Sequence, residues 1–144
     1  YAEIKAKAEA ALGCGLGVIL CVGEILAVRA PGAAVETVIT QLKASLPDAT
    51  AGKLAVAYEP VWAIGTGKVP TTAEIREMHG AIRKQLMERY GIAGSVTRIL
   101  YGGSVKASNA AEIFAVSDVD GALVGGASLT AEDFIPIVAA AAAA

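Results

Sequence analysis

"LAVAYEP", residues 54–60, is an almost continuous apolar run that ends at a glutamate followed by a proline. Proline has no backbone N–H and forces the residue before it toward an extended conformation, so the run is typical of a strand that stops at Glu59. Apolar residues do not alternate with polar ones, which indicates a parallel strand covered on both faces. The sequence therefore predicts a buried parallel strand with a carboxylate at its carboxyl end.

Three similar apolar runs lie at residues 17–24, 98–105 and 120–126, and each is followed by a segment with helical periodicity. The segment 72–90 has apolar residues every three or four positions, and a second apolar stripe covers 35–46. Strands that alternate with helices in this way predict an α/β fold built on a parallel sheet.

Capping patterns mark two helix starts, Thr71 with Glu74 and Thr130 with Asp133. Residues 1–12 form a helical pattern with no capping residue, no initiator methionine and no secretory signal before it, so we expect a preceding segment to be missing. The alanine-rich end is expected to be a helix that frays.

The chain has 144 residues, of which 55% are hydrophobic, and we predict a single domain over residues 1–144. Four strand–helix units fit a small open sheet of the flavodoxin type. They also fit half of an eight-stranded barrel, which takes about 250 residues. The length is consistent with both.

Composition excludes several classes of protein. Twelve basic and fourteen acidic residues give a net charge of −2 without a basic cluster, which excludes a nucleic-acid binder. Apolar stretches are interrupted well before the ~20 residues that span a bilayer, so we expect a soluble protein with no membrane partner. Cys14 and Cys21 lack CxxC spacing and a nearby histidine, so we expect no metal site and reduced, cytoplasmic thiols. Cys21 is predicted to be a small core residue.

Carboxylates and glycines gather where the predicted strands end. Glu24, Glu59, the group 102–104 and the pair 125–126 all follow strands directly. Ligands of parallel α/β folds bind at this edge. Glycines at two successive strand ends, one group with a serine, let backbone N–H groups approach an anion. We therefore predict a phosphate cradle, with two plain tight turns as the alternative.

Glu59 is a candidate general base, because the following proline holds its carboxylate at this edge. Trp62 then supplies a large apolar cover, and Gly65 and Gly67 allow the backbone changes of a moving flap. The alternative is a carboxylate that caps a helix or pairs with a lysine.

Other polar residues are predicted to be structural. Arg83 and Asp120 are candidates for an ion pair, while Arg98 and Lys106 flank the third strand as solvated ends. His79, the one histidine, is expected on a helix surface.

The segments "YEPVWAIGTGK" (58–68), "YGGSV" (101–105) and "VGGASL" (124–129), in this order, resemble the triosephosphate isomerase family, as does "CVGE" (21–24). The resemblance extends from residue 2 to the last helix. It corresponds to the later half of the family's (β/α)8 barrel, beginning in the helix after the fourth strand. It implies a parallel (β/α) half barrel of four βα units.

The resemblance also implies a function, the interconversion of dihydroxyacetone phosphate and glyceraldehyde 3-phosphate in glycolysis and gluconeogenesis, with no cofactor and no metal. Glu59 would be the catalytic base, and the phosphate of the triose would bind Gly65, Ser104, Gly125 and Gly126. The lid would span residues 60–70, with Pro60, Trp62, Ile64, Thr66, Gly67 and Lys68. Glu24 would hold Trp62 when the lid is open, and Tyr101 would hold Trp62 when the lid is closed.

The family's Asn, Lys and His electrophiles belong to the half that the resemblance does not cover. We therefore expect this chain to be nearly inert alone, because one oxyanion donor is typically worth ~10²- to 10³-fold in rate. Two alternatives remain, a non-catalytic phosphate-binding half barrel and a self-associating structural fragment. A half barrel exposes strand edges and an apolar inner face, so a complementary N-terminal half or a second copy is the expected partner.

Overall fold

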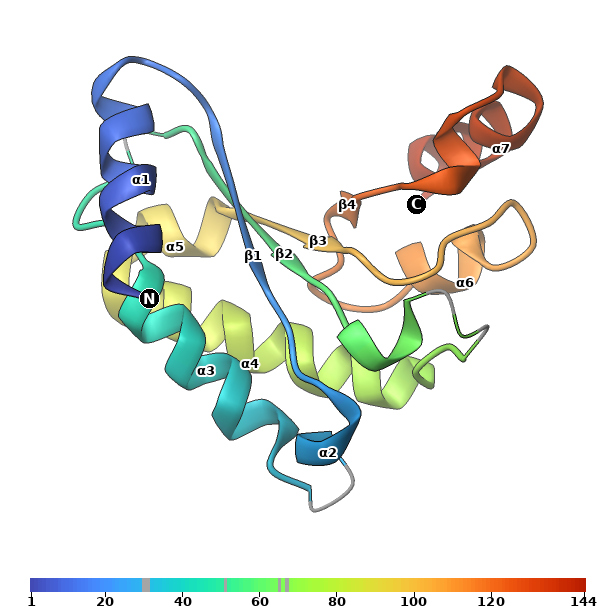
Figure 1. Ribbon diagram of the computed structural model, residues 1–144. Helices are drawn as coiled ribbons and strands as arrows, with labels where there is room; N and C mark the ends of the chain where they lie inside the picture. Colours follow the sequence, from blue (N-terminus) through green and yellow to red (C-terminus); the bar gives the residue numbers. More distant parts are fainter. Residues whose placement is uncertain (30–31, 51, 65, 67) are drawn as a thin grey trace.

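The computed structural model describes residues 1–29, 32–50, 52–64, 66 and 68–144. Its described residues form one parallel sheet whose strands lie side by side in chain order (Figure 1). The strands are β1 (Val18–Val22), β2 (Leu54–Tyr58), β3 (Arg98–Tyr101) and β4 (Gly121–Ala122). Val22, Tyr58, Tyr101 and Ala122 lie in register, so all four carboxyl ends meet at one edge. The predicted α/β fold with a parallel sheet is confirmed.

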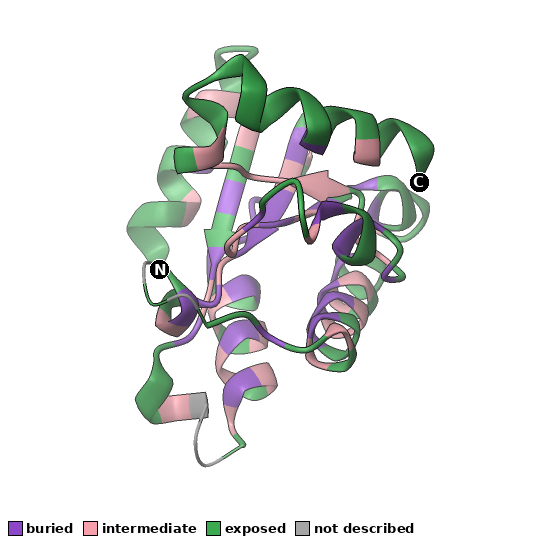
Figure 2. Cartoon of the chain, turned by 90° about the vertical axis from the view of Figure 1, so that its right-hand side faces the viewer, coloured by how far each residue is buried: buried purple, intermediate pink, exposed green. Residues whose placement is uncertain are grey.

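The helices connect these strands. They are α1 (Ala2–Gly13), α2 (Leu26–Arg29), α3 (Ala34–Ser45), α4 (Thr72–Tyr90), α5 (Ile92–Val96), α6 (Ala110–Phe114) and α7 (Ala131–Ala143), with the 3-10 turns η1 (Val61–Ala63) and η2 (Gly126–Ser128). The short helices α2 and α5 were not predicted, because four or five residues show no period, whereas α6 is the helix expected after the run 98–105. The alanine-rich end does not fray, since α7 stays helical to Ala143, although most of it is exposed (Figure 2).

The predicted helix starts of α4 and α7 are present. The Thr71 hydroxyl accepts a hydrogen bond from the Glu74 N–H at 3.3 Å, and the Glu74 carboxylate accepts one from the Thr71 N–H at 2.7 Å. Thr130 accepts from the Asp133 N–H at 3.3 Å. These bonds satisfy N–H groups that have no partner within the helix, and they fix where each helix leaves its loop.

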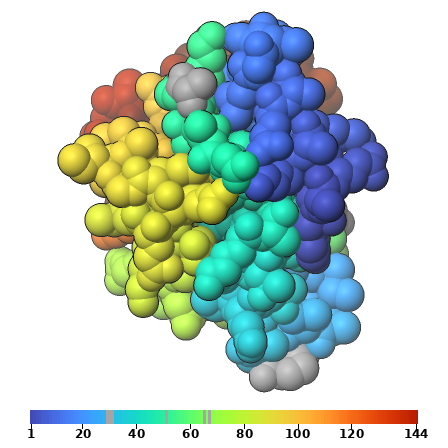
Figure 3. Space-filling model, turned by 90° about the vertical axis from the view of Figure 1, so that its left-hand side faces the viewer, coloured from blue at the N-terminus to red at the C-terminus, as the bar shows by residue number. Residues whose placement is uncertain are grey.

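One face of the sheet carries the core. Leu20, Val56 and Ile99 lie in register on this face and are buried against the helices, with Val38 of α3 and Ile82 of α4 in the same cluster. Helix α3 packs against α1 and α4, and α5 packs against α4, on the side of the molecule shown in Figure 3. Helices α6 and α7 lie near β4 (Figure 1). No membrane-crossing candidate exists among the described helices, since none is both long and apolar enough.

The opposite face of the sheet is covered by no helix in the described part of the chain (Figure 1). Ile19 on this face is 50% exposed, and Cys21 is exposed as well. The predictions of strands covered on both faces and of a core position for Cys21 were therefore wrong. The reason is topological. Right-handed crossovers between strands added in one direction place every helix on the same side.

His79 was predicted on a helix surface, and this was also wrong, because its side chain is fully buried on α4. Its Nδ1–H donates to the carbonyl of Asp118 at 2.9 Å, and its ring meets that of Tyr58 edge-on at 5.9 Å. Burial lowers the pKa of the imidazole, and the Asp118 hydrogen bond opposes this only in part. The side chain is therefore a neutral part of the core.

The predicted ion pair of Arg83 with Asp120 is confirmed, at 2.6 Å, and Arg83 also binds the carboxylate of Asp118 at 2.9 Å. Asp118 has a left-handed backbone with φ of 62°, which is uncommon for a residue with a side chain. Arg83 and His79 therefore tie the turn before β4 to the side of α4.

The burial of neutral His79 predicts a pH-dependent stability. The unfolded chain takes up a proton at this histidine near pH 6.5, whereas the folded chain resists protonation until a lower pH. The free energy of unfolding should therefore fall as pH decreases from about 7, with a slope of up to about 1.4 kcal/mol per pH unit. Urea unfolding followed by circular dichroism at several pH values measures the slope.

His79→Asn is the matched variant for this measurement, because an amide can keep the bond to Asp118 without titrating in this range. Its slope between pH 7 and 5 should be smaller than that of the unsubstituted chain. Equal slopes would show that His79 does not carry the effect.

Candidate active site

The carboxyl ends of β2, β3 and β4 surround one pocket of about 460 Å³. Its lining residues are Glu59, Ile64, Gly102, Gly103, Ser104, Val105, Lys106, Leu123, Val124, Gly125, Gly126 and Ala127. The pocket therefore brings together the candidate base and three of the four predicted phosphate-binding residues. The fourth, Gly65, lies outside the described residues, as does Gly67 of the predicted lid.

Glu59 is held in place by the two neighbouring strand ends. Its N–H donates to the carbonyl of Val22 at 2.8 Å, and the N–H of Gly102 donates to the carbonyl of Tyr58 at 2.8 Å. A Cβ on Gly102 would lie 2.5 Å from Cγ of Glu59, and one on Gly23 would collide with the Glu59 carbonyl. Glycine at position 102 thus leaves room for the Glu59 side chain, and glycine at position 23 leaves room for the Glu59 backbone.

The loops after β3 and β4 form a second part of the pocket wall, which offers hydrogen-bond donors. The Ser104 hydroxyl makes no hydrogen bond to the described residues. Gly125 and Gly126 are exposed and lead into η2, where Ser128 closes the turn by donating to the Gly125 carbonyl. Backbone N–H groups at the start of such a turn point outward and suit an anion.

Two residues of the loop after β3 were not identified from the sequence as parts of the site. Asn109 donates to the Ser104 carbonyl at 3.0 Å and accepts from the Lys106 N–H at 2.8 Å, so it shapes the loop after β3. Lys106 was predicted to be an ordinary solvated end; it is exposed, but it lines the pocket. The contacts of Asn109 span three to five residues in an irregular loop, where no sequence period reveals them.

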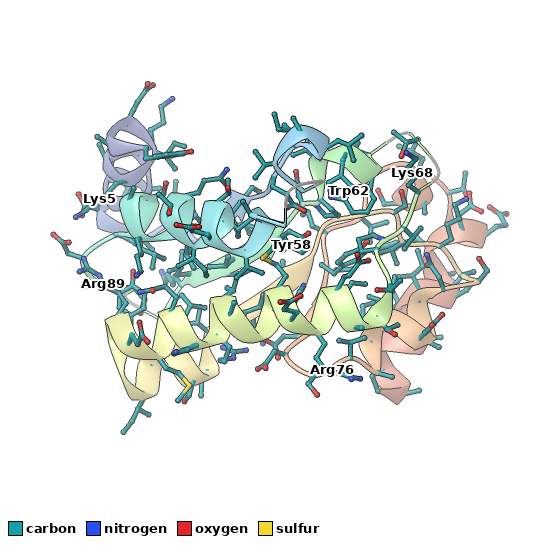
Figure 4. The ribbon with its side chains drawn as sticks, turned by 90° about the horizontal axis from the view of Figure 1, so that it is seen from below. Lys5, Tyr58, Trp62, Lys68, Arg76 and Arg89 are labelled. Carbon is teal, nitrogen blue, oxygen red and sulfur yellow. The ribbon has the colours of Figure 1, made fainter. Side chains whose placement is uncertain are left out.

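The predicted lid begins with buried Pro60 and the 3-10 turn η1. The Thr66 hydroxyl lies 3.1 Å from the carbonyl of Trp62 and 3.2 Å from that of Ala63, and it accepts from the Lys68 N–H at 3.2 Å. Ile64 lines the pocket. Lys68, labelled in Figure 4, is exposed to solvent. The Thr66 hydroxyl therefore forms hydrogen bonds within the predicted lid segment itself.

Trp62 is attached to the body of the protein through Glu24. The Glu24 carboxylate is 1% exposed, and its Oε1 accepts from the Trp62 indole N–H at 2.9 Å and from the Tyr58 hydroxyl at 3.0 Å. Figure 4 shows Tyr58 and Trp62 near each other. The contact expected between Glu24 and Trp62 is thus present.

Tyr101 lies beneath the loop after β3. Its hydroxyl is so close to Gly103 that any larger residue at position 103 would collide with it. This oxygen is buried and has no hydrogen-bond partner among the described residues. Burial raises the pKa of Tyr101 to about 12, so the hydroxyl stays protonated and can donate a hydrogen bond.

The pocket therefore combines one carboxylate with a set of N–H and O–H donors, and the segment that follows the carboxylate is tethered through Trp62. Within the described residues there is no cluster of three or more His, Cys, Asp or Glu able to hold a metal ion. Such a site can move a proton on a small molecule while its donors hold an anionic group.

Comparisons with known proteins agree with this geometry. A family model described as triosephosphate isomerase matches residues 1–141. The triosephosphate isomerase of Ruegeria sp. (strain TM1040) is 59% identical over 143 residues, which are 99% of this chain and 58% of the relative. That of Xanthobacter flavus is 54% identical over 140 residues, 96% of this chain and 56% of the relative. The chain thus spans little more than half the length of these relatives.

A crystal structure of triosephosphate isomerase from Bartonella henselae superposes with a TM-score of 0.89 at 44% identity, and the match covers 96% of this chain and 56% of the other. The open four-stranded sheet therefore corresponds to half of a TIM barrel. The prediction of a parallel half barrel of four βα units is confirmed.

The tether on Trp62 predicts a specific fluorescence change. Glu24→Leu removes the acceptor of the indole N–H, so Trp62, the one tryptophan of the chain, should become more accessible to acrylamide quenching. Loss of a buried acceptor should also lower the free energy of unfolding by about 1–3 kcal/mol. Stern–Volmer quenching and urea unfolding measure the two effects.

Tyr58→Phe is the control, because it removes the other donor to Glu24 and leaves the indole bond intact. Its quenching constant should equal that of the unsubstituted chain. Quenching that is unchanged in Glu24→Leu would contradict the tether.

Proposed function

The chain belongs to the triosephosphate isomerase family, and on that premise we propose that its pocket serves the interconversion of dihydroxyacetone phosphate and glyceraldehyde 3-phosphate, a step of glycolysis and gluconeogenesis. The observation that carries the proposal is the shared pocket, which is lined by Glu59 and also by Ser104, Gly125 and Gly126. A three-carbon phosphate ester has an acidic C–H and a dianionic group at its two ends, which matches a carboxylate and a set of hydrogen-bond donors in one pocket.

Glu59 is the base in this proposal. Its carboxylate takes a proton from the carbon beside the carbonyl and leaves an enediolate, then returns the proton to the neighbouring carbon. No atom is gained or lost, since substrate and product are isomers. Gly102 leaves space for the Glu59 side chain and Gly23 leaves space for its backbone carbonyl, so a larger residue at either position would displace the base.

The phosphate binds at the glycine-rich wall. Backbone N–H groups of Gly125 and Gly126 and the hydroxyl of Ser104 donate to its oxygens, and the exposed Lys106 adds positive charge at the edge of the pocket. Gly65 donates from the lid when the lid closes. No cofactor and no metal takes part in this scheme.

Lid closure requires Trp62 to leave Glu24. In the structure the indole binds Glu24, so we assign this arrangement to an open lid. The Tyr101 hydroxyl is a protonated donor without a partner among the described residues. In this proposal it holds Trp62 when the lid is closed. A closed lid excludes water from the enediolate and strengthens the electrostatic interactions inside.

The 144-residue chain by itself should bind phosphate and isomerise slowly. Of the residues that line its pocket, Lys106 is the one positively charged side chain, and it lies on the phosphate wall. Stabilising the negative charge on the enediolate oxygen needs a further hydrogen-bond donor on the open side of the pocket. The part of the relatives that lies outside their match with this chain would supply that donor. The two cysteines carry free thiols, which fits a cytoplasmic location.

Binding of 2-phosphoglycolate tests the phosphate wall. In NMR titrations the amide signals of Ser104, Gly125 and Gly126 should shift. Gly126→Val places a bulky side chain beside these donors, and a Cβ there meets no atom within 4 Å, so the site has room for its first carbon. We expect the affinity of this variant to fall at least about tenfold, because hydrogen bonds to a charged group are lost.

Gly13→Val is the matched control for this titration. A Cβ at Gly13 also meets no atom within 4 Å, and the residue lies at the end of α1, outside the pocket. Its affinity should be unchanged. Amides that do not respond to 2-phosphoglycolate would rule out the site.

Turnover tests the catalytic part of the proposal. In a coupled assay with glyceraldehyde 3-phosphate, the chain alone should be at least about 10²- to 10³-fold slower than its full-length Ruegeria relative, as for loss of an oxyanion donor. Turnover close to that of the relative, abolished by Glu59→Gln, would show that the chain is sufficient by itself.

A further inference from the structure

Gln41 of α3 binds both backbone groups of Gly23, the first residue after β1. The Gly23 N–H donates to Oε1 of Gln41 at 3.0 Å, and Nε2 of Gln41 donates to the Gly23 carbonyl at 2.9 Å. A glutamine amide carries an acceptor and donors in one plane, so it pairs with a backbone as the facing residue of an antiparallel strand does. Gln41 thus continues the hydrogen bonding of β1 by one residue, beyond its register with β2, which ends at Val22.

Gly23 lies where two parts of the candidate site meet. A Cβ on it would collide with the Glu59 carbonyl, so its bare Cα packs directly against the peptide that joins Glu59 to Pro60. The residue that follows Gly23 is Glu24, whose carboxylate accepts from the Trp62 indole. The position of Gly23 therefore affects both the backbone of the candidate base and the tether on Trp62.

A glycine at this position needs to be constrained from outside. Without a Cβ, glycine has more backbone freedom to lose than any other residue. One hydrogen bond would leave a peptide beside Gly23 free to rotate, whereas bonds to its N–H and to its carbonyl fix the peptides on both sides. Strand β1 is an outer strand of the described sheet, and Gln41 supplies this constraint from α3, which packs against β1 (Figure 1).

The support comes from a well-packed helix and acts on an exposed loop. Helix α3 buries Val38 and Leu42 in the core, and half-buried Gln41 lies between them in sequence. In the loop that follows Gly23, the side chains of Ile25 and Leu26 are 55% and 52% exposed. A group on a rigid element holds its partner more precisely than one on a loop.

We propose that Gln41 is a positioning residue of the site. It fixes Gly23, and through Gly23 it holds the Glu59 backbone against Val22 and keeps the Glu24 carboxylate within reach of Trp62. Gln41 is not among the residues that line the pocket, so its effect is transmitted through the backbone. The inference rests on the proposed function for the roles of base and lid.

The pairing with Gly23 requires an amide. A glutamate at position 41 has nearly the same shape and can accept from the Gly23 N–H, but its ionised carboxylate has no donor for the Gly23 carbonyl. Protonation gives the carboxyl group an O–H donor beside its remaining acceptor. Gln41→Glu should therefore lose the link at pH 7 and regain it below about pH 4.3, the pKa of an unperturbed glutamate.

Hydrogen exchange followed by NMR measures the link at the base. At pH 7 the Glu59 amide, which donates to the Val22 carbonyl, should exchange at least about tenfold faster in Gln41→Glu, as for loss of one hydrogen bond. The Gly102 amide, which donates to the Tyr58 carbonyl from the other neighbouring strand, should keep its rate. Equal acceleration at both amides would indicate a general loss of stability and would contradict a positioning role.

Acrylamide quenching of Trp62 measures the link at the lid. The Stern–Volmer constant of Gln41→Glu should be raised at pH 7 and should return to that of the unsubstituted chain on acidification. Gln41→Met removes both bonds without adding charge, so its constant should stay raised at both pH values. Each variant is compared with the unsubstituted chain at the same pH, which accounts for the titration of other groups, including Glu24 and His79.

Gln85→Glu is the matched control, because it makes the same chemical change at the other glutamine of the chain, on α4. It should alter neither the exchange of the Glu59 amide nor the quenching of Trp62. Circular dichroism checks that each variant is folded, and Gln41→Met serves for both readouts at pH 7 if Gln41→Glu is not.

Unchanged exchange and quenching in the Gln41 variants, or quenching of Gln41→Glu that acid does not restore, would overturn the inference. Neither readout uses a substrate. A chain in which Gln41 acts as described but whose amides do not respond to 2-phosphoglycolate would leave this inference standing and contradict the proposed function.

Discussion

The right-handed crossover between parallel strands is the constraint on which the rest of this structure depends. Strands β1 to β4 are added in chain order, so each crossover returns on the same side and every packed helix lies on one face of the sheet. That face becomes a conventional core around Val56, Ile82 and Ile99. The other face remains open, and all four carboxyl ends meet at one edge.

The candidate site follows from that edge. The neighbouring strand ends fix the backbone of Glu59 by hydrogen bonds, Gly23 leaves space for its carbonyl, and Gly102 leaves space for its side chain. The segment after Glu59 is attached differently, through a buried carboxylate that accepts from Trp62. In the function that we propose, a fixed base and a tether that can be released suit a reaction whose intermediate must be shielded from water and whose product must leave.

The same topology arranges charge along the open face of the sheet. Glu59 lies at the carboxyl end of this face and Arg98 at the amino end, with an apolar surface between them. The candidate base and a positive charge therefore lie at the two ends of a single face.

Local signals in the sequence determined the elements and the candidate base. Apolar runs located the four strands, the capping pairs at Thr71 and Thr130 located two helix starts, and the proline after Glu59 marked the strand end, because each of these depends on neighbours within a few residues. Tertiary structure decided the environment of each side chain. His79 is buried because Tyr58 and Asp118 come from other elements, and Cys21 is exposed because no helix crosses its side of the sheet. A periodic pattern records that a residue is apolar or polar, but which face is covered depends on the handedness and order of the connections between strands.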